Sequence, residues 1–348
     1  MRAVKMSPAF GRRASYQSET NEENEHMEDR TLGKSGLKVS TISLGCWAIG
    51  GPSWRDGGAV GWSGNNDDDS VAGLHRACEV GINHLDTADV YGDGHSERMI
   101  GKFLQDVARD KMIIASKVGW FRGTAPNAMQ PAHVRHQLEQ TLINLGTDYV
   151  DLHYFHNTNF GPNDMYLEEA ADTMRQLQTE GKVRVIGQSA YGYHDFLRVC
   201  PVTRPDVLQF GYSAFGSGFD KPETNIFRWA EAQNLGMVLF GPLAQGLLLD
   251  KFDPENPPKF GDGDIRGGGY TRERLLDTRR RLQPLKERFG GEVQDLVRIA
   301  LQYALAQSPL ACVIPGFKNA RQVDSNAEAA TPSLTADEVA FVKQALQG

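Results

Sequence analysis

The sequence of 348 residues contains few cysteines and no long hydrophobic run. Its four cysteines, Cys46, Cys78, Cys200 and Cys312, lie far apart, and none of them forms a CxxC pair. This spacing argues against a disulfide framework or a zinc knuckle, and it favours reduced, buried thiols in a cytoplasmic protein. No apolar stretch approaches the roughly 20 residues of a membrane span, and the N-terminus lacks a hydrophobic secretion segment. We therefore expect no membrane insertion.

The sequence also lacks a sustained basic face, and its formal net charge is -7. Because phosphate backbones require such a face, we expect no nucleic-acid partner. No GxGxxG motif follows the first predicted strand, which argues against a Rossmann arrangement. The hydrophobic content of 40% is sufficient for a large core, and the length allows one large domain or two ordinary ones.

The first 29 residues have no apolar periodicity and change from a basic start to an acidic end. We interpret residues 1–29 as a disordered tail and place a single folded domain at 30–348. The first eighteen residues contain serine and arginine but almost no acidic residues, as organellar transit peptides do. A solvated tail, or a start codon placed too early with Met27 available, is favoured over that reading.

From residue 30 onward, short β-branched runs alternate with amphipathic helical patterns. The candidate strands are 39–44, 82–85, 112–116, 149–155, 183–188, 207–210, 237–240 and 312–314. The helical patterns between them are 69–80, 96–108, 132–145, 167–180, 194–199, 223–233 and 292–306. Such alternation specifies an α/β fold with parallel strands, and eight units fit a closed (β/α)8 TIM barrel better than an open sheet. A hairpin at 30–45 and extra helices at 271–289 and 336–346 are predicted additions to this barrel.

In a parallel barrel, polar residues at the C-terminal ends of the strands converge on one site. Asp86, Lys117 and His156 end their predicted strands, and Tyr91 lies in the glycine-rich loop that follows Asp86. Taken singly, each has an ordinary structural reading as a strand end, a snorkelling lysine, a satisfied histidine or a half-buried loop aromatic. His153 and His156 should face opposite sides of their strand, so they are not expected to share a metal. Three aspartates at 67–69 are better explained as helix N-terminal charge than as a metal site.

Taken together, these four residues form a reagent set for carbonyl reduction. A tyrosine has a pKa near 10, and an adjacent lysine ammonium should stabilise its phenolate and bring the pKa into a useful range. Asp86 would keep Lys117 charged and oriented, while His156 would donate a hydrogen bond to the carbonyl oxygen as negative charge develops there.

The motifs DTADVYG, HSERMIG, ASK and DYVDLHYFH, in this order and spacing, resemble the aldo-keto reductase family over essentially all of residues 30–348. The resemblance implies a (β/α)8 barrel that binds NADP(H) in an extended form, and a catalytic set of Asp86, Tyr91, Lys117 and His156. Tyr91 would act as the general acid. It also implies a small-molecule carbonyl or alcohol substrate, and we expect a monomer or a weak homo-oligomer.

The resemblance also implies cofactor contacts. GKVRVIGQSA is similar to the family's GKIRxIGVSN, which places Ser189 and Gln209 at the nicotinamide carboxamide, although Ala190 replaces the usual asparagine. LFGPLAQG is similar to YSPLGxG and places the Phe240 ring on the nicotinamide. IPGFKNARQVDSN is similar to IPGxxxxxQxxxN, where Lys318 beside a helix N-terminus suits a ribose 2′-phosphate and favours NADP over NAD. The implied cofactor set is Gly45, Cys46, Trp47, Asp86, Ser189, Gln209, Phe240, Gly241, Pro242, Leu243, Gln245, Gly316, Lys318, Gln322 and Asn326.

Aromatic residues are expected to form the substrate wall. The long loop after the first strand carries Trp47, Trp54 and Trp62, and Trp120 closely follows Lys117. The predicted substrate contacts are Trp47, Tyr91, Trp120 and His156.

Three functions fit this reading. The first is an NADPH-dependent reductase of aldehydes or ketones, and the second is a sugar or polyol dehydrogenase that uses the same residues oxidatively. The third is a non-catalytic redox sensor, since some barrels of this family serve as regulatory subunits of ion channels. The complete set of four catalytic residues argues against the sensor.

Overall fold

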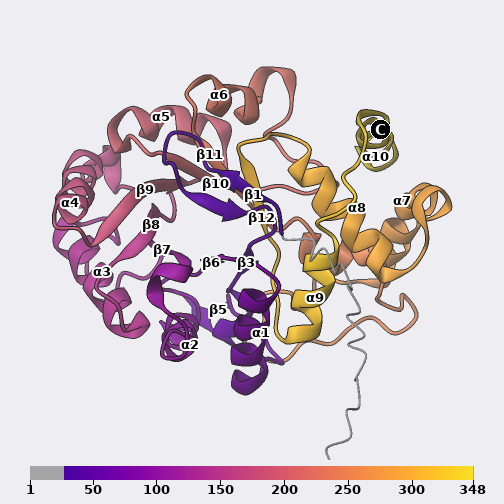
Figure 1. Ribbon diagram of the computed structural model, residues 1–348, viewed down its shortest axis with the longest axis horizontal. Coiled ribbons are helices and arrows are strands. Elements are labelled where there is room, and N and C mark those ends of the chain that lie inside the picture. The colour runs from indigo at the N-terminus through magenta and orange to yellow at the C-terminus, as the bar shows by residue number, and fades with distance from the viewer. Residues whose placement is uncertain (1–26, 348) are drawn as a thin grey trace, which may run out of the picture.

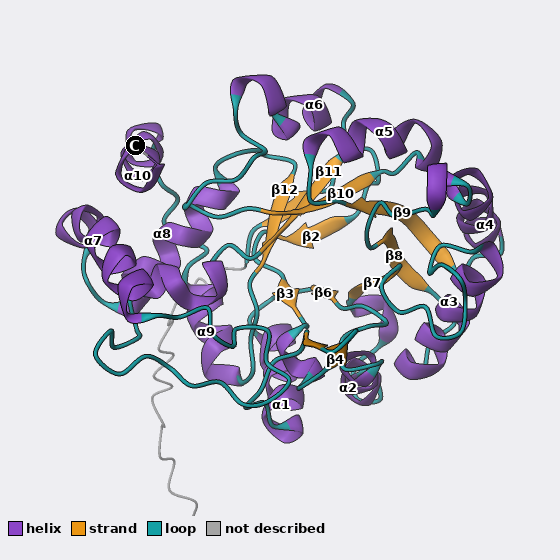
Figure 2. Ribbon diagram, turned by 180° about the vertical axis from the view of Figure 1, so that it is seen from behind, coloured by secondary structure: helices purple, strands orange, loops and turns teal. Residues whose placement is uncertain are grey.

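The computed structural model describes residues 27–347, and its centre is a sheet of eight parallel strands. In sheet order these are β12 (Ala311–Ile314), β11 (Gly236–Phe240), β10 (Val207–Gly211), β9 (Val183–Ser189), β8 (Val150–Phe155), β7 (Ile113–Val118), β6 (His84–Asp86) and β3 (Leu44–Gly45). Parallel bridges from Ile42 to Val313 and from Gly45 to Gly316 join the two edges. The sheet thus closes into a barrel (Figure 2), and the predicted (β/α)8 fold is confirmed.

Helices surround the barrel (Figure 1). Those of the repeating units are α1 (Asp67–Glu79), α2 (His95–Phe103), α3 (Pro131–Leu145), α4 (Leu167–Thr179), α5 (Tyr193–Thr203), α6 (Ile226–Ala232), α8 (Val293–Leu305) and α9 (Ala320–Glu328). The two predicted extra helices are α7 (Arg272–Phe289) and α10 (Ala336–Gln347), which pack together on the outer side of α8 (Figure 1). Short 3-10 turns are η1 (Ala48–Gly50), η2 (Arg109–Lys111), η3 (Pro162–Asp164), η4 (Pro222–Thr224) and η5 (Ala244–Leu249). Among the described residues, no helix has the length and apolar character needed to cross a bilayer.

Capping fixes where α1 begins. The Asn66 side chain accepts a hydrogen bond from the Asp69 N–H at 3.0 Å, and Asp67, Asp68 and Asp69 form the first helical turn. Because carboxylates stabilise the positive end of a helix dipole, the three aspartates have the structural role that the sequence indicated.

An N-terminal hairpin of β1 (Asp29–Thr31) and β2 (Lys38–Ser40) lies across one end of the barrel (Figure 1). The predicted strand at 39–44 is therefore wrong as one element, because its first two residues pair with β1 and only Leu44 joins the barrel. The break lies at Ser40, whose carbonyl accepts from Ser43 Oγ at 2.9 Å and whose N–H donates to Asn83 Oδ1 at 2.8 Å.

The ordered chain begins slightly before the predicted boundary. Asp29, which we assigned to the tail, is the first residue of β1, and the Glu28 carbonyl accepts a hydrogen bond from the Thr41 N–H at 2.8 Å. The rest of the predicted tail, residues 1–26, lies outside the described residues. Its disorder stays a prediction.

The barrel interior is apolar at the hairpin end and charged at the other end. Leu32, Leu37 and Val39 of the hairpin pack against inward-facing strand residues such as Leu152 and Val207. Further along the same strands lie the buried polar side chains of Asp86, Lys117 and Gln209. The four cysteines are free, and all but Cys78 are buried.

His153 on β8 gives a pH-dependent stability. Burial lowers its pKa to about 3, whereas an unfolded histidine has a pKa near 6.5. Below pH 6.5 only the unfolded chain gains this proton, so stability is lost as the pH falls. We expect His153 to cost about 2 kcal/mol in the free energy of unfolding between pH 7 and pH 5.

Guanidinium unfolding at both pH values checks this, with His153→Gln as the comparison. All other titrating groups are shared by the two proteins, so the difference in their pH dependence isolates His153. Equal pH dependence in both proteins would contradict the prediction.

Candidate active site

Lys117 is the centre of a buried hydrogen-bond network at the C-terminal end of the barrel. It lies on β7 and is 0% exposed. Its Nζ donates to Asp86 Oδ1 at 2.5 Å, to the Thr87 carbonyl at 2.6 Å and to Tyr91 Oη at 3.3 Å. An ammonium has three protons, so all its donors are used and the group has one orientation. The second oxygen of Asp86 accepts from Gln209 Nε2 at 2.7 Å.

Tyr91 is held by the turn between β6 and α2. Gly92 has a φ of 61°, and a Cβ there would lie 2.0 Å from the Gly50 carbonyl oxygen, so glycine is required. On the other side, the Trp47 indole stacks on the Tyr91 ring, with centroids 5.9 Å apart and planes at 24°. The phenol is therefore fixed beside Lys117 from both sides.

His156 follows β8 and turns its ring toward Tyr91. The ring centroids are 5.8 Å apart, and the His156 N–H donates to the Val118 carbonyl at 2.8 Å. Burial first, and then the charge of Lys117, lowers the pKa of His156 well below its usual range. The imidazole is therefore neutral at physiological pH. It carries one N–H, and its buried Nδ1 has no hydrogen-bond partner in the described part of the chain.

The pKa of Tyr91 differs from the sequence-based expectation. Burial first, and then the negative charge of Asp86, raises this pKa well above 10. Lys117 does not reverse the effect, because its charge is already neutralised by Asp86 at 2.5 Å. The phenol is consequently protonated at neutral pH, which suits a proton donor.

Residues predicted at the nicotinamide gather beside this network. Gln209 on β10 is in register with Ser189 on β9, and both are buried. The Gln209 amide is already bound to Asp86, while Ala190 is buried with its N–H on the Gln209 carbonyl at 3.2 Å. The Phe240 ring lies against Gly211, where a Cβ would come within 2.9 Å of it. This glycine leaves the space that the ring occupies.

The segment after β11 contains the other residues predicted near the pyrophosphate. Gly241 has a φ of 69° and Gln245 a φ of 55°, so the backbone turns sharply between them. Pro242 and Leu243 lie within this turn, where Pro242 is buried and Leu243 half-buried. Beside the first barrel strand, Gly45 is bridged to Gly316, and Cys46 is buried behind them.

The predicted 2′-phosphate site lies at the start of α9. The Asn319 side chain caps this helix by accepting from the Gln322 N–H at 3.0 Å, and Gln322 Oε1 accepts from the Lys318 N–H at 2.8 Å. The buried Asn326 amide reaches the Gly316 carbonyl at 3.5 Å. Lys318 Nζ donates to the Ser63 carbonyl, which turns it toward the loop after β3.

Sequence reasoning missed a second cation there, Arg266. Burial first, and then the charge of Arg266, lowers the pKa of Lys318. Asp264 pairs with Arg266 at 2.7 Å and also accepts from the Ser63 N–H at 2.8 Å. The Arg266 guanidinium lies 4.1 Å from the Trp62 ring centroid. No local pattern marks this cluster, because it joins loops 201 residues apart.

Aromatic side chains line the mouth of the barrel. The centroid of the Trp120 ring, 38% exposed, lies 6.3 Å from that of His156 and 6.4 Å from that of Tyr191. Tyr191 in turn meets Phe240 edge-on at 6.2 Å. Trp120 is thus where the sequence predicted it, whereas Tyr191 was missed because a single tyrosine after a strand carries no distinctive pattern.

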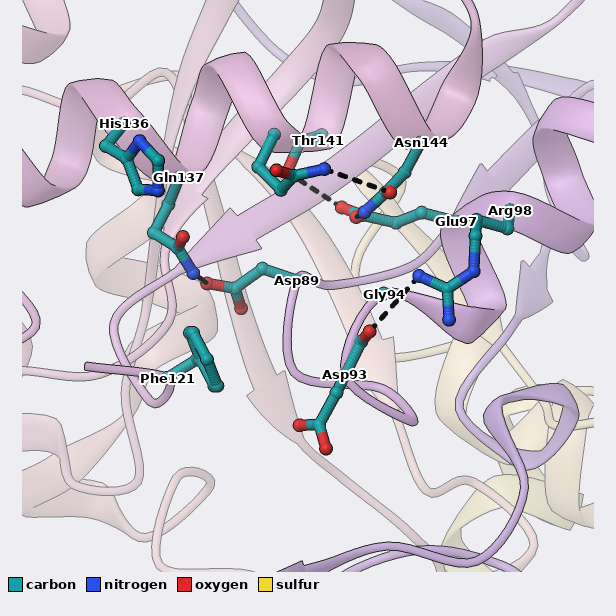
Figure 3. A pocket seen from close by; sticks show the side chains of 11 residues that line it. Asp89, Asp93, Gly94, Glu97, Arg98, Phe121, His136, Gln137, Thr141 and Asn144 are labelled. Carbon is teal, nitrogen blue, oxygen red and sulfur yellow. Dashed lines mark hydrogen bonds between the residues drawn. The ribbon is translucent and has the colours of Figure 1, made fainter. Parts of the chain in front are cut away.

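A pocket of about 270 Å³ lies to one side of this network, between α2 and α3 (Figure 3). It contains the buried carboxylates Asp89 and Glu97. Glu97 accepts hydrogen bonds from Ser116, Thr141 and Asn144 at 2.7 to 2.8 Å and so ties α2 to β7 and α3. These contacts give Glu97 a structural role, and the pocket contains none of the four predicted catalytic residues.

Known proteins resemble this chain over nearly its full length. The model of the Aldo/keto reductase family matches residues 41–347. L-galactose dehydrogenase of Arabidopsis thaliana is 28% identical, with 88% of each chain covered. The NADH-specific methylglyoxal reductase of Escherichia coli is 26% identical, with 91% of this chain and 98% of that protein covered. The structure of a glycerol dehydrogenase from Gluconobacter oxydans superposes with a TM-score of 0.73 at 26% identity, covering 93% of this chain and 95% of the other.

The family match spans the whole barrel, including the strand ends that carry Asp86, Lys117 and His156. The chain therefore belongs to the aldo/keto reductase family and is an oxidoreductase of carbonyl and alcohol substrates.

Proposed function

We propose that the chain reduces aldehydes or ketones to alcohols with NADPH, and that Tyr91 is the general acid. The observation that carries this proposal is the position of Lys117 Nζ, which lies between Asp86 Oδ1 and Tyr91 Oη next to the neutral His156. A protonated phenol, a fixed cation and a neutral imidazole are the groups that the reduction of a carbonyl requires.

A nicotinamide dinucleotide bound here would supply the hydride. Tyr91 Oη donates its proton to the carbonyl oxygen, and Lys117 stabilises the phenolate that remains. His156 donates its one N–H to the same oxygen and orients the carbonyl over the phenol. Trp47 and Trp120 flank this position and exclude water from it.

The residues present fit such a dinucleotide. Phe240, seated on Gly211, offers a flat face for the nicotinamide, while Ser189 and Gln209 lie beside it at the strand ends. The sharp turn at 241–245 would hold the pyrophosphate with its backbone N–H groups. Lys318 and Arg266 together form a cationic site at the capped start of α9, which suits a 2′-phosphate.

A turnover assay with the purified full-length chain, NADPH and a panel of aldehydes tests this proposal. We expect NADPH consumption with stoichiometric alcohol formation. Tight NADPH binding without turnover of any aldehyde or ketone would refute the reductase and favour the sensor.

The oxidative direction is the second candidate. The similarity to L-galactose dehydrogenase favours it, because that protein's name describes the oxidation of a sugar. The same chain incubated with NADP⁺ and a panel of aldoses and polyols distinguishes the two directions. A higher kcat/KM in this assay than with any aldehyde would assign the sugar or polyol dehydrogenase activity.

Lys318→Ala is expected to raise the KM for NADPH by about 10- to 100-fold, the effect of losing a charge-assisted contact of roughly 1.5–3 kcal/mol. The KM for NADH should change little, because NADH lacks the 2′-phosphate. Steady-state kinetics with both cofactors provide the measurement.

Lys343→Ala is the matched control, since it removes the same charge from α10, where Lys343 pairs with Asp220 at 3.2 Å. An equal loss with NADPH and NADH in Lys318→Ala would show that Lys318 does not bind the 2′-phosphate.

A further inference from the structure

Arg55 is a cation at the mouth of the barrel. It lies in a small hairpin, β4 (Trp54–Arg55) and β5 (Gly58–Ala59), within the loop after β3. Both ribbon views place this hairpin beside β3 and β6, close to α1 and α2 (Figures 1 and 2). Its guanidinium carbon lies 5.7 Å from the Trp120 ring centroid. Trp120 is the aromatic whose other neighbour is His156, at 6.3 Å.

The charge of Arg55 is not paired within residues 27–347. Asp89, Asp93 and Asp56 attract the guanidinium only across a distance, without a hydrogen bond, and burial lowers its pKa. Burial also raises the pKa of Asp89 well above its usual range, so Asp89 is a weak counter-charge. Asp93 and Asp56 are exposed, and water screens their charges. A half-buried arginine in this position is available to an external anion.

Arg55 also acts on the groups around the reaction site. Its positive charge helps to lower the pKa of His156 and that of Tyr191, which places it within electrostatic reach of both rings. The surface between Arg55 and His156 is aromatic and is formed by Trp120 and Tyr191. A flat or apolar substrate can lie along that surface while one end reaches Tyr91 and the other reaches Arg55.

We infer that Arg55 binds an anionic group of the substrate, and that this reductase selects carbonyl compounds in which a carboxylate is separated from the carbonyl by about the length of one aromatic ring. The inference rests on the proposed function. It assigns Arg55 to substrate positioning, because a planar guanidinium binds a carboxylate through two parallel hydrogen bonds.

Two aldehydes of nearly equal shape test this inference. 4-Carboxybenzaldehyde has an anionic group opposite its aldehyde, and 4-nitrobenzaldehyde has an uncharged group of the same outline. With NADPH, Arg55→Gln is expected to raise the KM for the carboxylate about 10- to 100-fold and to leave its kcat within a fewfold. The kinetics of the nitro compound and the KM for NADPH should stay within a fewfold, which also shows that the variant is folded.

Two further variants sharpen the result. Arg55→Lys keeps the charge and should restore most of the lost affinity for 4-carboxybenzaldehyde. Arg122→Gln removes an exposed arginine from the loop after β7 and should leave the preference between the two aldehydes unchanged. A similar loss in Arg122→Gln would mean that the overall field, and not Arg55, selects the anion.

The possible failures are distinguishable. If wild type reduces both aldehydes and Arg55→Gln affects them equally, the inference is wrong while the proposed function stands. If wild type reduces neither these nor any other carbonyl compound with NADPH, the proposed function is refuted and the inference falls with it.

Discussion

Tyr91→Phe is expected to lower kcat by at least the 10²- to 10⁴-fold that is typical of losing a general acid. The substitution keeps the ring that stacks on Trp47 and removes only the hydroxyl that Lys117 contacts at 3.3 Å. Because burial keeps this phenol protonated, no other group at the same position can provide its proton. Single-turnover reduction of an aldehyde whose chemical step limits the rate provides the measurement.

NADPH binding is the control for this variant. Fluorescence quenching should give a dissociation constant within a fewfold of wild type, since the hydroxyl is not among the predicted cofactor contacts. If Tyr91→Phe keeps more than about a tenth of wild-type turnover, the proton donor must be reassigned, and His156 would be the first candidate.

Lys117→Met is expected to reduce kcat as strongly as Tyr91→Phe does. Without the ammonium, the phenolate that forms on Tyr91 would face only the negative charge of Asp86, which already raises the pKa of the phenol. The two losses should not add in the double variant, because both disable the same proton transfer. Single-turnover rates of the three variants test this.

The buried ion pair complicates this variant and also supplies its control. Removing Lys117 leaves Asp86 buried and unpaired, which typically costs about 3–5 kcal/mol of stability. The double variant Asp86→Asn, Lys117→Met removes both charges and should regain much of that stability in a thermal unfolding experiment. It should remain inactive, and activity close to wild type in this double variant would contradict the role of the cation.

The barrel and its reaction centre were predictable because both rest on local or periodic signals. Alternating strand and helix patterns specify parallel strands, and the ends of such strands meet at one face. Asp86 and Lys117 end their strands in the sequence, and the structure joins them by a hydrogen bond. The motif spacing resembled the family whose model the chain matches.

Other features depended on contacts that a sequence does not display. The strand predicted at 39–44 breaks at Ser40 because Asn83, 43 residues away, binds its N–H. Arg55 and Arg266 lie in glycine-containing loops with no periodic pattern, and their roles come from partners such as Trp120 and Trp62. The pKa of Tyr91 required knowledge of its burial, which reverses the direction that the sequence suggested.

The N-terminal hairpin has a consequence for how the protein is made. Arg30 in β1 donates hydrogen bonds to the carbonyls of Leu305, Ser308 and Ala311, which lie 275 to 281 residues further along the chain. At ribosomal speeds of about 5–20 residues per second, those acceptors emerge on the order of tens of seconds after Arg30. Until then the edge of β3, which pairs across the barrel with the segment around Val313, remains an open strand edge. The nascent chain therefore depends on protection from aggregation until almost all of it has left the ribosome.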